Sequence, residues 1–207
     1  MIDLRVRQRF ARLVTDLVTA RPGLWRVVRR PFIWSFGAIA PDWEEKRVSP
    51  EHLAPLEAAL AAVPGEPAAA LDLGTGTGAG ARAIVRRFDH TTVTGVDASQ
   101  PMIDQARARA TGDRERYDVA DASALPYPDA SFQLVTQLNM IPFFDEMARV
   151  TAPGGHVAVA FSRGPRTPIW VPLDRVQTEL ERRGFLHVAN FSAGVGVALL
   201  AQRADTS

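Results

Sequence analysis

The sequence has 207 residues, of which 46% are hydrophobic and 23% are charged, and its formal net charge at pH 7 is +1. This length suits one α/β domain with an extension and is too short for two ordinary domains, and the composition is that of an ordinary globular protein. The sequence contains no cysteine, which excludes disulfides, a thiol nucleophile, thiolate metal sites and a cysteine-held iron–sulfur cluster.

The start of the chain differs in charge from the rest. Residues 1–50 carry ten basic and five acidic side chains, a net charge of +5, whereas the other 157 residues carry −4. Apolar residues at helical spacing predict an amphipathic helix that ends near residue 21: Val6, Phe10, Leu13 and Leu17. A segment rich in arginine and aromatic residues follows at residues 24–36. We therefore expect an N-terminal helical extension, or cap, over residues 1–48.

The residues of this extension suit three interpretations. It can pack on the main domain as a cap whose aromatic residues cover the mouth of a pocket, and we favour this interpretation. Its arginines would also suit an anionic bilayer surface or a lipid-like substrate, in contact with residues 1–40. The aromatic residues concerned are Trp25, Phe32, Trp34 and Phe36. Nucleic-acid binding is not expected, because the rest of the chain is acidic and the arginines form no recognisable binding motif.

An α/β domain is predicted over residues 49–203. Ser49 and Pro50 have the residue types of an N-cap and of a first helical position, so a helix should begin there. Farther along, strand-like runs alternate with helical patterns, which is the order typical of a doubly wound sheet. Two strand-like runs near the end of the chain are close enough to form an antiparallel hairpin. Residues 204–207 are expected to be a loose tail.

The most informative stretch joins a strand to a helix through glycines. Residues 69–73 predict a buried strand, because small and apolar residues follow one another without polar alternation. Gly74, Gly76 and Gly78 come next, before a predicted helix at residues 79–87. Glycines permit a tight turn and let the backbone approach a ligand at the unpaired N–H groups of a helix start. This arrangement predicts a nucleotide-type pocket.

Glycine spacing alone leaves two classes of ligand. Gly74, Gly76 and Ala79 satisfy the dinucleotide pattern, and Asp97 lies about where a ribose-binding acid belongs. Asp72 discriminates between the classes. A carboxylate just before the first glycine repels a pyrophosphate, whereas it suits a ligand that carries a free ammonium group.

The segment Asp-Leu-Gly-Thr-Gly-Thr-Gly, residues 72–78, resembles the first motif of class I S-adenosylmethionine-dependent methyltransferases of the small-molecule type. The resemblance covers roughly residues 50–203. It implies S-adenosylmethionine as the cofactor and S-adenosylhomocysteine as the product. It also implies a Rossmann-like, doubly wound α/β fold, with a mostly parallel seven-stranded sheet in the order 3-2-1-4-5-7-6 and an antiparallel last strand. The cofactor contacts expected in this motif are Asp72, Gly74, Thr75, Gly76 and Gly78.

Two further strand ends complete the expected cofactor site. Asp97 follows a β-branched run, and a carboxylate at the carboxyl end of that strand can accept both vicinal ribose hydroxyls. Ala98 follows it directly. The resemblance implies that Met102 packs against the adenine, that Asp121 accepts from the adenine amino group, and that the N–H of Ala122 donates to the ring.

The acceptor side of the pocket is less clearly encoded. Gln137 and Asn139 follow the fourth predicted strand, between cofactor and acceptor, so both are candidates to orient the acceptor, and Gln137 is also an expected cofactor contact. The residues predicted to form the acceptor wall are Trp34, Phe36, Arg166 and Trp170. No residue has the pattern of a general base.

The expected reaction is methyl transfer from S-adenosylmethionine to a small or lipid-like acceptor by in-line displacement. One alternative is a catalytically silent protein that binds the cofactor and acts through its Arg- and Trp-rich extension. Another is an NAD-dependent oxidoreductase, which Asp72 disfavours. The four histidines lack metal-ligand spacing, so no metal is expected. We expect a cytoplasmic protein, because no apolar run approaches the roughly 18 residues of a membrane span and the first residues lack a signal-type apolar core.

Overall fold

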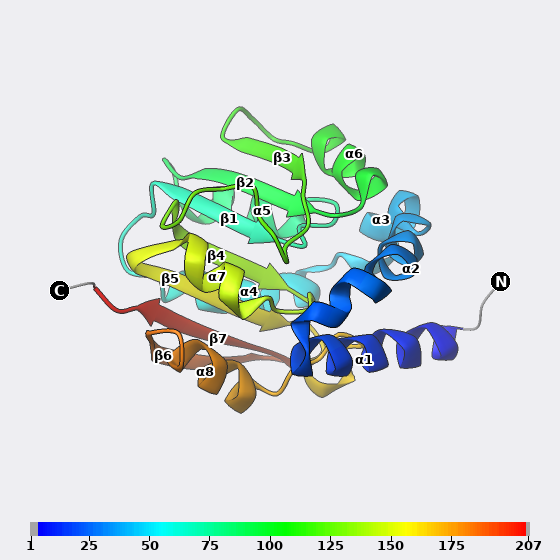
Figure 1. Cartoon of the computed structure of the whole chain (residues 1–207). Coiled ribbons are helices and arrows are strands. Elements are labelled where there is room, and N and C mark those ends of the chain that lie inside the picture. Colours follow the sequence, from blue (N-terminus) through cyan, green and yellow to red (C-terminus); the bar gives the residue numbers. More distant parts are fainter. Residues whose placement is uncertain (1–3, 206–207) are drawn as a thin grey trace.

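The computed structural model of the chain describes residues 4–205 (Figure 1). The predicted cap and the predicted tail therefore each extend slightly beyond the described residues. The strands are β1 (Ala69–Leu73), β2 (Thr92–Asp97), β3 (Glu115–Val119), β4 (Phe132–Leu138), β5 (Thr151–Phe161), β6 (Phe185–Ala193) and β7 (Gly196–Arg203). The α-helices are α1 (Leu4–Ala20), α2 (Trp25–Gly37), α3 (Trp43–Arg47), α4 (Pro50–Ala61), α5 (Ala79–Arg87), α6 (Gln100–Ala108), α7 (Phe144–Val150) and α8 (Leu173–Glu181). Short 3₁₀ turns lie at Pro22–Leu24, Ala40–Asp42 and Gly164–Arg166.

Within the described residues, the strands form one seven-stranded sheet in the order β3-β2-β1-β4-β5-β7-β6. Strands β1 to β5 pair in parallel, whereas β7 lies antiparallel to both β5 and β6. This is the predicted order with the predicted antiparallel last strand, and the fold class is confirmed. In Figure 1 the helices α1, α2 and α3 lie at the end of the sheet toward which the parallel strands point. Ligands bind at that end in doubly wound sheets.

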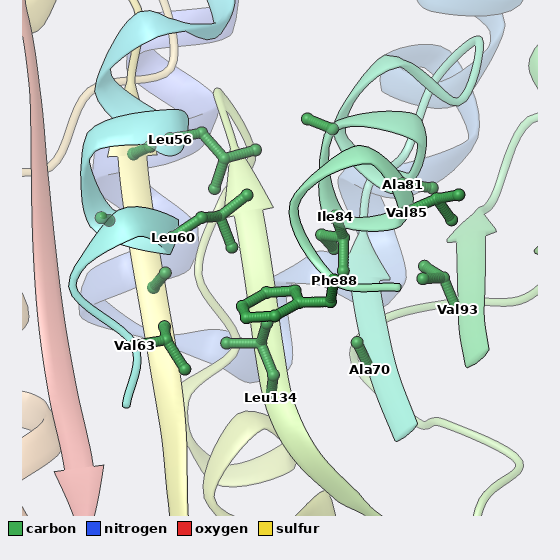
Figure 2. Packing of buried hydrophobic residues seen from close by; sticks show 14 of the residues in the cluster. Leu56, Leu60, Val63, Ala70, Ala81, Ile84, Val85, Phe88, Val93 and Leu134 are labelled. Carbon is green, nitrogen blue, oxygen red and sulfur yellow. The ribbon is translucent and has the colours of Figure 1, made fainter. Parts of the chain in front are cut away.

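Alternation along the buried strands distributes the core over both faces of the sheet. In β1, Ala70 packs with α4, α5 and α6, while the next residue, Leu71, packs with α7 and α8 on the other face. Figure 2 shows the first of these faces, where Phe88 at the end of α5 and Leu60 of α4 lie over Leu134 of β4. Because both faces are covered, the strand ends near the glycines are held by a rigid core.

The start of α4 is as predicted, and β5 begins earlier than predicted, with a bulge at the predicted turn residues. Ser49 accepts a hydrogen bond from the backbone N–H of His52 at 3.2 Å, and Pro50 takes the first helical position. The sequence predicts a turn at residues 153–155 and a strand from Val157, and β5 extends from Thr151. Thr151 pairs with Phe132 and His156 pairs with Leu134, so residues 152–155 form a bulge in which Gly154 has a φ of 71°. Continuous pairing with β4 begins at His156, next to the predicted start.

The N-terminal helices share a small apolar core with the loops that contain Ile141, Phe143 and Ile169, but α1 does not pack as its sequence predicts. Its inward face consists of small and β-branched residues: Ala11, Val14, Thr15 and Val18. The predicted apolar face is directed to solvent instead, with Phe10, Leu13 and Leu17 exposed by 38%, 57% and 41%; the side chain of Val6 lies outside those described. Small side chains let α1 approach its neighbours closely. None of the described helices has the length and apolar character needed to cross a membrane.

Candidate functional site

The glycine turn lies between the end of β1 and the start of α5. Gly74, Gly76 and Gly78 all have positive φ, at 62°, 55° and 87°, and Gly78 is the N-cap of α5. A side chain at Gly74 would strike Met140, since its Cβ would lie 2.6 Å from the Met140 sulfur. The N–H of Thr75 donates to the carbonyl of Val96 at 2.9 Å and thus ties the turn to β2. The predicted close-approach turn is therefore present and fixed in position.

Asp72 is a buried carboxylate under this turn, 2% exposed. It accepts hydrogen bonds from the hydroxyls of Thr75 at 2.6 Å and Thr136 at 2.8 Å. Burial raises the pKa of Asp72 to about 6, although the two hydroxyl donors act in the opposite direction. Gly80 packs against it, since a Cβ there would lie 2.7 Å from the carboxylate. An ionised Asp72 is thus held rigidly and lacks a cationic partner within hydrogen-bonding distance among the described residues.

Asp97 ends β2 beside the glycine turn. Its carboxylate accepts from the backbone N–H of Gly76 at 3.1 Å and from that of Ser99 at 2.9 Å. Burial, with a smaller contribution from the charge of Asp72, raises the pKa of Asp97 to about 6 against the lowering effect of the two N–H donors. Each oxygen keeps one free acceptor position, because a carboxylate oxygen has two.

A cavity at the carboxyl ends of the strands brings together most of the predicted cofactor residues. It is lined by Asp72, Gly74, Thr75, Gly76, Asp97, Ala98, Met102, Asp121 and Ala122. Its other wall comes from the cap and from loops at the same sheet end: Trp25, Phe32, Ile33, Phe36, Trp43, Val48, His52, Met140, Ile141, Phe143 and Ile169. Residues as far apart in the sequence as Trp25 and Ile169 thus line one cavity, at the end of the sheet where doubly wound folds bind ligands.

Two predicted cofactor contacts do not line the cavity. Gly78 lies behind the turn, where a Cβ would meet the Tyr117 hydroxyl at 2.7 Å, so its role is to permit the left-handed backbone. Gln137 is fully buried; its amide donates to the carbonyl of Met140 at 3.3 Å, and its carbonyl oxygen has no hydrogen-bond partner among the described groups. Neither Gly78 nor Gln137 is therefore placed to contact a ligand in the cavity.

Three of the predicted acceptor-wall residues also lie elsewhere. Trp34 is 70% exposed, because it follows the outer face of α2. Arg166 is exposed on a 3₁₀ turn, and Trp170 packs against Phe161 at a ring distance of 4.9 Å. Of the four predicted wall residues, Phe36 alone lines the cavity.

Asn139 lines the cavity, but its side chain is already engaged. Its amide donates to the Ser162 hydroxyl and its carbonyl accepts from the Ser162 N–H, both at 2.8 Å. The residue has φ of 57°, a conformation that asparagine tolerates better than most residues. Its side chain therefore fixes the turn after β4 to the end of β5.

The cap supplies more of the lining than the predicted acceptor wall, which included only Phe36 among the residues found there. Trp25 and Phe32 lie on the same face of α2 as Phe36 at helical spacing, in accord with the expectation that the cap aromatics cover the mouth of a pocket. Trp43 and His52 had no such signal in the sequence. Trp43 reaches the cavity because α3 is docked on the glycine turn, where Glu44 accepts from the Thr77 hydroxyl and pairs with Arg82. His52 reaches it from the first turn of α4.

The cavity is electrostatically one-sided. Among the described residues that line it there are three carboxylates, of Asp72, Asp97 and Asp121, and neither lysine nor arginine. His52 is the one lining side chain with an ionisable base, and burial, with the charge of Arg47, lowers its pKa. Such a lining suits a cationic ligand and opposes a pyrophosphate. No group of three or more His, Asp or Glu side chains that could hold a metal was found among residues 4–205.

Comparison with known proteins agrees with this geometry. Residues 70–155 match the sequence model of a family described as "Methyltransferase domain". This part of the chain is a methyltransferase domain. The predicted resemblance to class I S-adenosylmethionine-dependent methyltransferases is thereby confirmed, and with it S-adenosylmethionine as the cofactor of the family.

Individual relatives of the methyltransferase domain were also found. A malonyl-[acyl-carrier protein] O-methyltransferase of Halorhodospira halophila is 38% identical over 151 residues, which are 69% of this chain and 50% of that protein. A demethylmenaquinone methyltransferase of Deinococcus radiodurans is 34% identical over 147 residues, 66% of this chain and 61% of the relative. The structure of an S-adenosylmethionine-dependent methyltransferase from Aquifex aeolicus superposes with a TM-score of 0.68 at 16% identity, covering 80% of this chain and 97% of that one. The chain spans about half the length of the curated relatives that it matches.

Proposed function

We propose that this protein transfers a methyl group from S-adenosylmethionine to a small, apolar acceptor by in-line displacement. One observation carries the proposal: a single cavity joins the glycine turn and three carboxylates to an apolar wall supplied by the cap. The first half of this cavity suits a donor with two positive charges, and the second half suits an uncharged partner.

The donor half supplies partners for the ribose, the ammonium group and the adenine of the cofactor. We assign the vicinal ribose hydroxyls to the free acceptor positions of Asp97, the ammonium group to Asp72, and the adenine to Asp121, Ala122 and Met102. When bound, S-adenosylmethionine supplies an activated methyl group on a positively charged sulfur, so no other electrophile is needed. The residues of the chain hold the donor, exclude water and place the acceptor in line with it.

The acceptor half favours a neutral molecule. Its wall is formed by Phe32, Ile33 and Phe36 of α2 with Ile141 and Phe143 after β4. The described lining offers neither lysine nor arginine to an anionic acceptor, and a desolvated carboxylate without a cation is strongly disfavoured. Of the acceptors named for the relatives, a menaquinone precursor fits this wall better than a malonyl carboxylate.

An activity assay tests the proposal. The protein is incubated with radiolabelled S-adenosylmethionine and either a reduced naphthoquinone or a malonyl thioester, and the labelled product is extracted. We expect label in the quinol and little in the thioester. If S-adenosylmethionine binds but label enters no acceptor of a wider apolar panel, the alternative of a catalytically silent binding protein replaces the proposal.

The cap also has features of a lipid-contact surface, and we propose this as its second task. Phe10, Leu13 and Leu17 form an exposed apolar stripe on α1, and Val27 and Trp34 are 76% and 70% exposed on α2. Arginines interleave with them, and residues 1–50 carry a net charge of +5. Exposed apolar side chains beside arginines favour an anionic bilayer surface, and such a contact would bring a lipid-like acceptor to the cavity.

A further inference from the structure

The carboxylate assigned to the adenine is held by the cap. Asp121 follows β3 and lines the cavity. Its Oδ1 accepts from the indole N–H of Trp25 at 2.8 Å and from the backbone N–H of Ser123 at 3.0 Å, and its Oδ2 accepts from Arg29 at 2.9 Å. Trp25 and Arg29 are both on α2, more than 90 residues earlier in the chain.

These bonds leave a defined acceptor capacity. A carboxylate has about four acceptor positions, two on each oxygen. Both positions of Oδ1 and one of Oδ2 are taken by the three donors, so a single position remains, on Oδ2. Burial alone would raise the pKa of Asp121, but the donors from Ser123, Arg29 and Trp25 together hold it below its ordinary value. Asp121 is thus ionised near neutral pH and can only accept.

The two cap donors differ in how firmly they are fixed. Trp25 is 6% exposed, and its ring makes edge contacts with Phe32 at 5.6 Å and with Phe143 at 5.5 Å. The side chain of Arg29 is 44% exposed, so its ion pair is weakened by solvent. Trp25 therefore supplies most of the orientation, and Arg29 adds a charge that depends on ionic strength.

We infer that Trp25 and Arg29 are positioning residues of the base-recognition subsite, which orient Asp121 so that its remaining acceptor position selects an exocyclic amino group. The inference rests on the proposed binding of an adenosyl donor and extends it to residues of the N-terminal cap. An oriented acceptor recognises the amino group of adenine and rejects hypoxanthine, which carries an oxo group at the same position. Base selectivity and docking of the cap are then properties of the same three side chains.

The test compares two ligands on matched variants of the full chain. Affinities for S-adenosylhomocysteine and S-inosylhomocysteine are measured by calorimetry for the wild type, for Trp25→Phe and for Trp34→Phe, which alters an exposed tryptophan of the same helix. We expect Trp25→Phe to weaken S-adenosylhomocysteine about tenfold and to lower the ratio of the two affinities by a similar factor, in line with one lost hydrogen bond to a charged group. Trp34→Phe should change neither value.

A second pair of variants avoids any disturbance of the buried ring. Arg29→Gln should lower the ratio about threefold at low salt and have no effect at high salt, whereas Arg30→Gln on the same helix should do nothing at either. A Trp25→Phe protein that is folded and retains both affinities and their ratio overturns the inference alone; if that variant does not fold, an unchanged ratio in Arg29→Gln at low salt has the same consequence. Failure of the wild type to bind S-adenosylhomocysteine overturns the proposed function as well.

Discussion

Replacement of Asp97 by alanine is the sharpest single perturbation of the donor site. In the proposed complex, each carboxylate oxygen already holds one backbone N–H, from Ser99 or Gly76, and takes one ribose hydroxyl in its remaining position. Two hydrogen bonds to a charged acceptor contribute about 1.5–3 kcal/mol each, so their loss should cost about 3–6 kcal/mol of binding free energy. That corresponds to a decrease in affinity of about 100-fold to 20,000-fold.

The fold should survive this substitution. Burial raises the pKa of Asp97, so near neutral pH the folded state holds an unfavourable charge that alanine removes, while the N–H groups of Gly76 and Ser99 lose an acceptor. Because these effects oppose each other, the thermal midpoint should move by only a few degrees. Calorimetry with S-adenosylhomocysteine and a thermal melt, with Asp104→Ala as an exposed acid on α6, measure both quantities. A folded Asp97→Ala protein whose affinity changes less than about threefold refutes the ribose assignment.

Other predictions concern packing, pH and the cap. Gly80→Ala should lower the free energy of unfolding by about 1–3 kcal/mol and should also lower donor affinity. The added methyl group would lie 2.7 Å from the Asp72 carboxylate, and this clash outweighs the higher helix propensity of alanine. A variant that is more stable than the wild type in chemical denaturation would contradict this prediction. Burial raises the pKa of Asp72 to about 6, so the folded state binds more protons than the unfolded state between about pH 4 and pH 6. The free energy of unfolding of the wild type therefore falls as pH rises through that window, and Asp72→Asn should gain stability relative to the wild type. A difference in unfolding free energy between the two proteins that does not change with pH would be evidence against this. The same carboxylate must be ionised to hold an ammonium group, so affinity for S-adenosylhomocysteine should fall as pH drops below about 6 in calorimetric titrations, and constant affinity would count against that role. The double substitution Leu13→Ser and Leu17→Ser should abolish flotation of the protein with anionic liposomes. The control substitution Leu186→Ser, at an exposed position on β6, should leave flotation unchanged. Equal flotation of the wild type, the double variant and the control removes the lipid-contact proposal.

The cofactor half of the site was predictable from sequence because its signals are local. Gly74, Asp72 and Asp97 each lie at the end of a strand whose apolar run is continuous, so a sheet of known handedness places them together without further information. The strand order came instead from the resemblance to class I methyltransferases, and the sheet has that order. At the start of β5 the predicted turn residues 153–155 form a bulge, and the strand begins earlier than predicted because Thr151 pairs with Phe132 before that bulge.

The cap half was less predictable because it depends on which face of each helix meets the domain. Helix α1 has two apolar faces, and the larger one, with Leu13 and Leu17, is the exposed one. Size favours that face for burial, but only contact with the loops that contain Phe143 and Ile169 selects the face of Val14. Packing between segments that are distant in the sequence decides which face of α1 is buried, so the apolar periodicity of the helix does not predict it.

A crystal structure of the protein with S-adenosylhomocysteine tests the central claim most directly, namely that the carboxylates and the glycine turn bind a cationic adenosyl donor. The account predicts ribose hydroxyls on Asp97, the homocysteine amino group toward Asp72, and the adenine beside Asp121. A structure in which the turn binds the pyrophosphate of a dinucleotide, or in which saturating S-adenosylhomocysteine leaves the turn empty, would contradict it.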